Sequence, residues 1–228
     1  MARANRSAVI FPGSEASESM SNEWLERWAN GRTGWHQAEG NAGLRKHWPE
    51  TSGRVLVPLC GKSPDMLWLA ARGHDVVGVE LAEAAIREFF AEQTLDFNFD
   101  DTGPMHCYSA VDLPITLYCG DYFSFAGDRF DGLYDRGALV AINPSLREKY
   151  IRVTRNLLNP DARRLIVTLE YEQDVVQGPP FAVTANEMTR YWPDLERVSA
   201  QEDIENCPPK FREGGLTTIK EVVWLSAG

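Results

Sequence analysis

Short apolar runs alternate with amphipathic segments along most of this chain, starting at Arg54. The apolar runs predict strands, and apolar positions three or four residues apart predict helices. The expected strands cover residues 55–57, 74–80, 115–119, 130–134, 165–169 and 217–224, and the expected helices cover residues 65–72, 82–90, 146–158 and 185–191. This alternation is typical of βαβ units, so it predicts a doubly wound α/β fold with a mostly parallel sheet and helices on both faces.

An amphipathic helix is expected before the first strand. Ser21 has the character of an N-cap, and Trp24, Leu25 and Trp28 then fall on one helical face. Gly31 and the asparagine before it end the helix. The aromatic positions on this face make the helix a candidate to cover a core or a ligand.

Four other segments carry local signals. Residues 33–37 form a loop with a large aromatic side chain, and residues 41–47 predict a short helix that ends before a proline. Residues 94–112 are polar and without a readable pattern, so we expect a long surface excursion there. Thr184 and Glu187 have the spacing of a capping box, which predicts a helix start.

Length and composition fit one globular unit. The chain has 228 residues, of which 43% are apolar and 25% are charged. One α/β domain can hold this length, and the composition is ordinary for a folded protein. We expect a single domain over residues 21–228 and a disordered tail over residues 1–20, which carry only a short apolar patch. Nothing in the sequence demands a second copy, so we expect a monomer.

Charge, hydropathy and cysteine spacing argue against several partners. The formal net charge is −10 and the 23 basic residues form no dense block, so phosphate backbones would be repelled. No apolar run approaches the roughly 20 residues that cross a bilayer. The four cysteines include no C-x-x-C pair, which disfavours a zinc site and fits reduced thiols in a cytosol. We therefore predict a cytoplasmic protein with no nucleic acid, membrane or metal partner.

The first strand-to-helix turn differs from a dinucleotide-binding turn. It reads Pro58-Leu59-Cys60-Gly61-Lys62-Ser63, with one glycine where several spaced glycines would admit a pyrophosphate, so a ligand without phosphates is favoured. Nineteen residues past Gly61, Glu80 ends the second strand. An acidic side chain there can accept hydrogen bonds from both hydroxyls of a ribose. The alternative for Glu80 is a solvated glutamate that starts a loop.

Polar residues also follow the third and fourth strands, at the sheet edge where open α/β sheets bind ligands. In Gly120-Asp121-Tyr122, Asp121 can accept a hydrogen bond from an adenine amino group, with a plain turn as the alternative. After the fourth strand, Arg136 can bind a carboxylate or clamp an anionic acceptor. Its alternative is a surface ion pair with Asp135, which would contribute little.

Six segments together carry a specific set of motifs. They are Trp28-Ala29-Asn30-Gly31, Trp35-His36-Gln37, Val57-Pro58-Leu59-Cys60-Gly61-Lys62, Gly73-His74-Asp75-Val76-Val77-Gly78-Val79-Glu80, Asp135-Arg136-Gly137-Ala138-Leu139-Val140-Ala141-Ile142-Asn143-Pro144 and Gly178-Pro179-Pro180-Phe181. From about Trp24 to its end, the chain resembles the thiopurine S-methyltransferase family. The resemblance implies a class I methyltransferase fold with a seven-stranded sheet whose last strand is antiparallel. It also implies an enzyme that moves a methyl group from S-adenosylmethionine to the sulfur or selenium of a small acceptor, with S-adenosylhomocysteine as the product.

The resemblance further implies roles for individual residues. Around the cofactor, it implies that Trp24 and Trp28 cover the ligand and that Leu59 and Gly61 line it. It also implies that Glu80 binds the ribose and that Asp121 and Tyr122 lie beside the adenine. Around the acceptor, it implies that Trp35 covers the site and that Arg136 is a cation shared with the cofactor site. Pro180 and Phe181 would form an apolar wall. A second basic residue is expected near the last strand, where Lys210 and Arg212 are candidates and Arg212 is favoured.

Methyl transfer from a sulfonium needs alignment and exclusion of water more than it needs a strong base. Arg136 would position the acceptor and favour its thiolate form. No Ser-His-Asp order and no metal-binding spacing is present, so hydrolysis and metal catalysis lack candidates. We interpret Cys60 as a packing residue and His36 as a structural or surface residue, although His36 adjoins the covering aromatic Trp35.

Two alternatives to thiol methylation stay open at this point. The same fold and cofactor can serve the methylation of inorganic anions such as selenite, tellurite, halide or thiocyanate, and an anion would suit Arg136. A catalytically silent S-adenosylmethionine-binding protein would keep the sheet and lose the acceptor side. Trp35, Arg136 and the Gly178–Phe181 segment argue against the silent protein.

Overall fold

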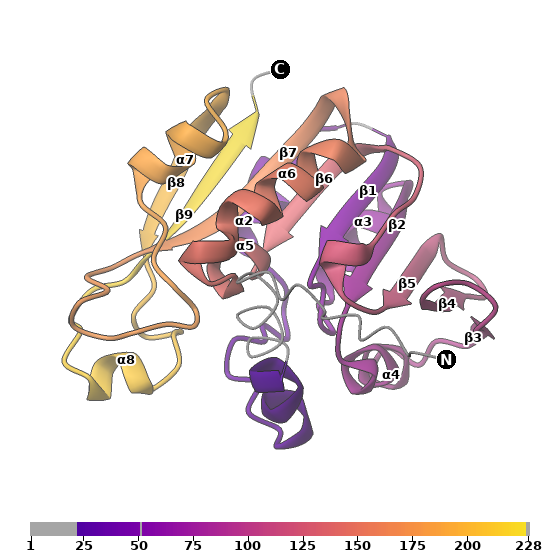
Figure 1. The fold of residues 1–228 in the computed structure, drawn as a ribbon, viewed down its shortest axis with the longest axis horizontal. Helices are drawn as coiled ribbons and strands as arrows, with labels where there is room; N and C mark the ends of the chain where they lie inside the picture. The colour runs from indigo at the N-terminus through magenta and orange to yellow at the C-terminus, as the bar shows by residue number, and fades with distance from the viewer. Residues whose placement is uncertain (1–21, 51, 227–228) are drawn as a thin grey trace, which may run out of the picture.

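The computed structural model describes residues 22–50 and 52–226, which contain a nine-stranded sheet (Figure 1). The strand order is β3-β4-β5-β2-β1-β6-β7-β9-β8. The strands are β1 Gly53–Pro58, β2 His74–Glu80, β3 Phe97–Asp100, β4 His106–Ala110, β5 Ile115–Cys119, β6 Phe130–Arg136, β7 Leu158–Glu170, β8 Leu195–Glu202 and β9 Lys220–Ser226. The five central strands from β5 to β7 are parallel, and an antiparallel pair extends the sheet on each side.

Helices cover both faces of this sheet. They are α2 Ala42–His47, α3 Asp65–Ala71, α4 Glu83–Glu92, α5 Ala138–Ala141, α6 Arg147–Leu157, α7 Ala185–Tyr191 and α8 Lys210–Glu213, with the short 3₁₀ helices η1 Tyr122–Ser124 and η2 Pro144–Leu146. A further helix covers residues 22–29. The fold class predicted from the sequence is therefore confirmed.

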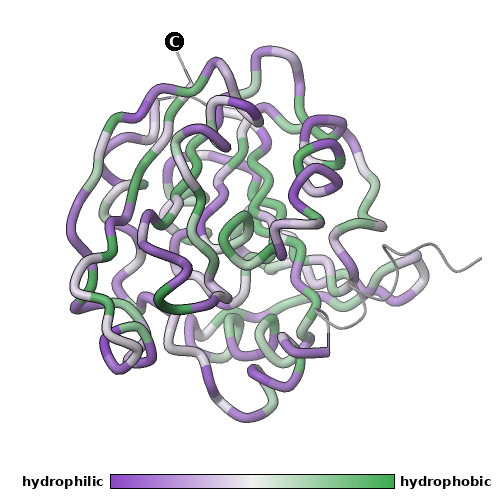
Figure 2. The backbone as a smooth tube through the Cα atoms, turned by 60° about the vertical axis from the view of Figure 1, so that its left-hand side comes forward, coloured by the Kyte–Doolittle hydropathy of each residue, from purple (hydrophilic) through white to green (hydrophobic). Residues whose placement is uncertain are grey.

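Alternate side chains of each central strand enter opposite cores. Leu56 and Ile166 pack with α5, α6 and α7 on one face, whereas Val55 and Val167 pack with α2, α3 and α4 on the other. Figure 2 shows hydrophobic stretches in the middle of the fold and hydrophilic stretches around them. Because both faces are covered, the central strands are apolar at consecutive positions, which is why their runs were readable in the sequence.

Several expected elements are confirmed, some with shifted ends. The strand over 74–80 is β2 as predicted, and the helix over 146–158 is α6 with its ends one residue shorter on each side. Thr184 and Glu187 form the predicted capping box at the start of α7. The expected disordered tail over 1–20 and the N-cap at Ser21 lie outside the described residues.

Two expectations were wrong. The stretch 94–112 is not a featureless excursion, because it contains β3 and β4, which pair with each other and with β5. The sheet has nine strands rather than seven, since β8 also pairs with β9 at the opposite edge. These three strands carry many exposed polar side chains, so they lack the apolar runs that identified the central strands.

The carboxyl ends of the parallel strands define one edge of the molecule. β1 and β2 are in register from Gly53 opposite His74 to Pro58 opposite Val79, so the residues that follow both strands meet there. In Figure 1 the helix over 22–29, drawn in dark indigo, lies below this edge. β9 runs antiparallel to β7, which brings the start of β9 to the same edge.

Candidate functional site

A cleft of about 1510 Å³, counting the space open to solvent, lies along this edge. Segments from both ends of the chain and from the ends of several central strands line it. The predicted site residues that the structure brings together here are Trp24, Trp28, Trp35, Leu59, Gly61, Glu80, Asp121, Tyr122, Arg136 and Pro180. Phe181 and Arg212, which were also predicted, are not among its lining residues.

The turn after β1 adopts a tight backbone conformation at the cleft floor. Leu59 and Gly61 both have positive φ angles, 46° and 52°. Such angles are uncommon for a residue with a side chain, and they cluster at ligand-binding sites. A Cβ atom on Gly61 would lie 3.2 Å from Cζ2 of Trp28, so the glycine lets the indole approach the turn closely. This turn and Trp28 therefore form one packed unit.

Glu80 is a buried carboxylate at the end of β2, with only 6% of its surface exposed. Its Oε2 accepts a 2.9 Å hydrogen bond from the amide of Gly61, and its Oε1 accepts a 2.8 Å bond from the amide of Ala82. Burial raises the pKa of Glu80, while these backbone donors act in the opposite direction. The alternative of a solvated glutamate is thus wrong. Each oxygen still has a lone pair with which it can accept another donor.

Three tryptophans form a roof over one part of the cleft. The ring of Trp35 makes edge contacts with Trp24 and Trp28, at centroid distances of 5.0 and 5.8 Å. Trp28 is buried against Ala82 and Ala85 at the start of α4. The helix over 22–29 and the loop that follows are thereby joined to each other and to the start of α4.

Asp121 and Tyr122 follow β5 and lie at the same cleft. One carboxylate oxygen of Asp121 accepts a 3.0 Å hydrogen bond from the amide of Phe123 and caps η1, so the predicted turn exists within the cleft wall. The hydroxyl of Tyr122 lies 2.9 Å from that of Thr154 inside the core. Tyr122 therefore offers ring or backbone surface to the cleft while its hydroxyl is already bonded.

Asp135 and Arg136 point to opposite faces of the sheet, because successive side chains in a strand alternate. Asp135 is buried and accepts hydrogen bonds from the Tyr150 hydroxyl at 2.7 Å and the Leu139 amide at 3.1 Å. Burial raises its pKa from 3.8 to about 6. Arg136 donates through Nη1 to the carbonyl oxygen of Trp35 at 2.8 Å. In the described part of the chain these two residues form no ion pair with each other, so that alternative is also wrong.

Several polar residues that line the cleft were not predicted from the sequence. They include Thr168, Asp203, Asn206 and Glu221. Glu221 lies near the start of β9, and its carboxylate oxygens accept hydrogen bonds from Nδ2 of Asn41 at 3.1 Å each. Burial raises its pKa. No local motif surrounds these residues, and the antiparallel course of β9 brings Glu221 to the cleft.

Burial also shifts the pKa values of His36 and Cys60, which both line the cleft. The pKa of His36 is lowered and that of the Cys60 thiol is raised, since burial disfavours the charged form of each. A neutral, buried thiol fits the interpretation of Cys60 as a packing residue. Its sulfur would lie 2.6 Å from a Cβ atom on Gly78, which shows how tightly it packs against β2.

Phe181 and Arg212 lie outside the cleft lining. The ring of Phe181 packs against the backbone of Gly178, and its amide donates a 2.6 Å hydrogen bond to the carbonyl of Val140. Arg212 is exposed and pairs with Glu205 at 2.5 Å. The other basic candidate, Lys210, donates through Nζ to the carbonyl of Pro179 at 2.6 Å.

Within residues 22–50 and 52–226, no cluster of three or more histidine, cysteine or acidic side chains is arranged to hold a metal ion. Over the same residues, no helix is both long and apolar enough to span a membrane.

Comparison with known proteins identifies close relatives in sequence. A family model described as Thiopurine S-methyltransferase (TPMT) matches residues 19–228. A thiopurine S-methyltransferase of Pseudomonas fluorescens is 41% identical over 214 residues, covering 90% of this chain and 97% of that protein. A thiopurine S-methyltransferase of Bordetella petrii is 43% identical over 210 residues, covering 88% of this chain and 95% of that protein.

Comparison with solved structures shows the same kind of fold. The 1,6-didemethyltoxoflavin-N1-methyltransferase of Burkholderia thailandensis, solved with bound 1,6-didemethyltoxoflavin and S-adenosylhomocysteine, aligns with a TM-score of 0.62 and 18% identity over 99% of this chain and 95% of that chain. TehB from Haemophilus influenzae aligns with a TM-score of 0.53 and 18% identity over 80% of this chain and 59% of that chain. At this identity the likeness shows the fold alone.

Proposed function

The chain belongs to the thiopurine S-methyltransferase family and is an S-adenosylmethionine-dependent methyltransferase, and from this premise we propose that it methylates the sulfur or selenium of a small thiol or selenol. The observation that carries the proposal is one continuous cleft with a buried carboxylate, Glu80, and a cation, Arg136, both among its lining residues. The carboxylate suits a ligand with hydroxyl donors. The cation suits a thiolate or selenolate.

The residues present fit the cofactor. Glu80 has spare acceptor capacity at the cleft floor and is the proposed ligand of the ribose hydroxyls. Leu59 and Gly61 would line the cofactor, and Trp24 and Trp28 would cover it. Asp121 and Tyr122 would flank the adenine, with the free oxygen of Asp121 as acceptor for the amino group. When bound, S-adenosylmethionine supplies an electrophilic methyl group on a sulfonium.

On the acceptor side, Arg136 is the proposed catalytic group. Its guanidinium would hold the acceptor sulfur and lower its pKa, because a nearby cation favours the thiolate over the thiol. The hydrogen bond from Arg136 to the carbonyl of Trp35 ties this cation to the aromatic roof. Trp35 and Pro180 would shield the reacting sulfur from water, which favours an aligned in-line displacement over side reactions.

The acceptor wall supports a ring-bearing acceptor over a bare anion. Apolar side chains that line the same cleft as Arg136 include Val140, Ile142, Leu169 and Pro180. Burying an aromatic ring against such a surface contributes affinity that an inorganic anion cannot obtain. We therefore rank aromatic and heterocyclic thiols above selenite, tellurite or halide. Phe181, whose ring packs against Gly178, would support the wall without lining it.

We further propose that residues 21–228 act as a single domain, in a cytoplasmic monomer without a nucleic-acid partner. The net charge of −10 opposes binding to phosphate backbones. Light scattering after size exclusion tests the oligomeric state, and a dimer mass at micromolar concentration would contradict it.

The decisive experiment is methyl transfer from labelled S-adenosylmethionine to 6-mercaptopurine and thiophenol, with iodide and selenite in parallel. Turnover of an aromatic thiol supports the proposal. Preference for iodide or selenite over every thiol would overturn the acceptor class. Tight cofactor binding without transfer to any acceptor of a broad thiol and selenol panel would identify a silent binding protein.

A further inference from the structure

The segment over residues 177–184 forms one wall of the cleft through Pro180 and contains no helix or strand. The amides of Phe181 and Val183 donate to the carbonyls of Val140 and Leu169, at 2.6 and 2.8 Å. Several other backbone groups of the segment are bonded to side chains from other parts of the chain. The hydroxyl of Tyr171 donates to the carbonyl of Pro180 at 2.7 Å. Lys210 Nζ donates to the carbonyls of Gln177 at 3.1 Å and Pro179 at 2.6 Å. The carbonyl groups on the Gln177–Pro180 side of the wall are therefore held by side chains, those of Tyr171 and Lys210.

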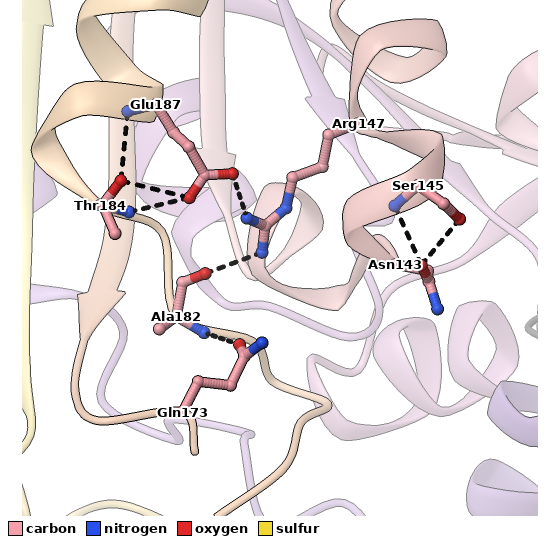
Figure 3. Close-up of polar contacts among 7 residues, drawn as sticks. All are labelled: Asn143, Ser145, Arg147, Gln173, Ala182, Thr184 and Glu187. Carbon is pink, nitrogen blue, oxygen red and sulfur yellow. Dashed lines mark hydrogen bonds and ion pairs between the residues drawn. The ribbon is translucent and has the colours of Figure 1, made fainter.

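The far end of this segment is held by a buried cation. Figure 3 shows Arg147, from the start of α6, reaching to both Ala182 and Glu187. Its guanidinium donates to the carbonyl of Ala182 at 2.9 Å and to the carboxylate of Glu187 at 2.7 Å, and the residue is 1% exposed. The amide of Ala182 donates to Oε1 of Gln173 at 2.9 Å. This end is thus fixed to the body of the fold.

Lys210 has an unusual set of partners for a lysine. Its ammonium donates to two neutral carbonyls, and the described part of the chain provides it with no carboxylate within ion-pair distance. Burial lowers its pKa, with Arg27 acting in the same direction and Glu23 against it. Hydrogen bonds from a charged donor are about twice as strong as neutral ones, so the two bonds hold the carbonyls firmly.

Arg212, two residues further along α8, has a different environment. Its guanidinium lies at the surface beside Glu205, with 44% of the side chain exposed. An exposed pair of this kind contributes little. Of the two basic residues expected near the last strand, only Lys210 contacts the segment that carries Pro180.

We infer that Lys210 is a positioning residue for the acceptor. Its bonds to the carbonyls of Gln177 and Pro179 keep Pro180 against the cleft, and this sets the affinity for acceptors that carry a ring. The inference rests on the proposed function, since it takes a small ring-bearing thiol as the acceptor. The cofactor residues proposed above come from other segments, so loss of Lys210 should leave cofactor binding unchanged.

The test compares wild type with Lys210→Met, Arg212→Met and Lys46→Met, the last being an exposed lysine on α2 remote from the wall. We expect Lys210→Met to raise KM for thiophenol about tenfold, the effect of about one lost charge-assisted hydrogen bond. The dissociation constant of S-adenosylhomocysteine should change less than about twofold, as should kcat, because only acceptor binding is affected. Lys210→Arg, which keeps a cation, should recover part of the affinity.

Three outcomes would overturn the inference. One is an unchanged KM in Lys210→Met, another is an equal loss of cofactor affinity, and the third is a larger KM effect in Arg212→Met than in Lys210→Met. If wild type methylates no ring-bearing thiol, the proposed function fails by itself. Hydrogen exchange at the amides of Phe181, Ala182 and Val183 then decides: faster exchange in Lys210→Met than in Lys46→Met supports the anchor, and equal rates reject it.

Discussion

The backbone amide of Gly61 donates a 2.9 Å hydrogen bond to the carboxylate of Glu80, which ties the turn after β1 to the end of β2. Because β1 and β2 are neighbouring parallel strands, this bond fixes the two sides of the cleft floor relative to each other. Glu80 therefore shapes the site as well as offering acceptor atoms to a ligand. A substitution at Glu80 is therefore expected to affect both the shape of the cleft floor and the acceptor atoms offered to a ligand.

Glu80→Ala is expected to weaken cofactor affinity by about 1 to 3 kcal/mol, the scale of a lost hydrogen bond to a charged group. Glu80→Gln keeps the shape and one acceptor oxygen, so it should lose less. Calorimetric titration with S-adenosylhomocysteine measures both variants. Asp75→Asn, at an exposed carboxylate on the same strand, is the control. Unchanged affinity in Glu80→Ala would refute the ribose assignment.

Gly61→Ala and Gly73→Ala form a matched pair. Both glycines have positive φ, 52° and 88°, so a side chain at either should cost about 1 to 2 kcal/mol of stability. Only at Gly61 would the new Cβ meet Trp28, whereas no atom lies within 4 Å of it at Gly73. We expect both variants to unfold at lower urea concentration and only Gly61→Ala to bind cofactor more weakly. Equal cofactor affinities would show that the contact with Trp28 is irrelevant to the site.

Arg136→Ala should lower kcat/KM for an aromatic thiol by about 10-fold to 100-fold, the size of one lost hydrogen bond to a charged partner. The fold should survive, since Arg136 is only partly buried and its hydrogen bond to a described residue goes to a loop carbonyl. Arg152→Ala, at an exposed position on α6, controls for the loss of a positive charge. Activity equal to wild type in Arg136→Ala would remove this residue from the site.

The stability of the protein should carry a pH dependence that belongs to Asp135. Its pKa rises on folding from 3.8 to about 6, so the folded state holds the proton more tightly than the unfolded state. This stabilising contribution is complete below about pH 4 and is lost as the pH rises to about 6. It corresponds to roughly 3 kcal/mol, because one pKa unit is about 1.4 kcal/mol.

Asp135→Asn removes this titration and provides the measurement. The free energy of unfolding in urea should be compared between wild type and variant at several values between pH 4 and pH 7. The difference between the two proteins should shift against wild type as the pH rises, and subtraction cancels the titration of Glu80 and Glu221, whose pKa values are also raised. A difference that is constant over this range would contradict the assignment.

Local pattern determined the central architecture of this protein. In β2 the apolar residues Val76, Val77 and Val79 face two buried cores. Their run therefore predicts a strand even when the adjacent strands are unknown. The edge strands were missed for the converse reason. Phe99 in β3 is 47% exposed and lies between polar neighbours, so the segment lacked the apolar run that marked the central strands.

The sequence by itself determined the family, the cofactor and the residues that follow each central strand, because motifs such as Pro58–Lys62 are local and specific. Only the tertiary structure decided which polar groups meet. Arg136 bonds to the carbonyl of Trp35, 101 residues away, rather than to its neighbour Asp135. Lys210, not Arg212, contacts the wall segment. Partners of this kind depend on the direction in which each side chain points and on how distant segments pack, and no pattern along the chain encodes either.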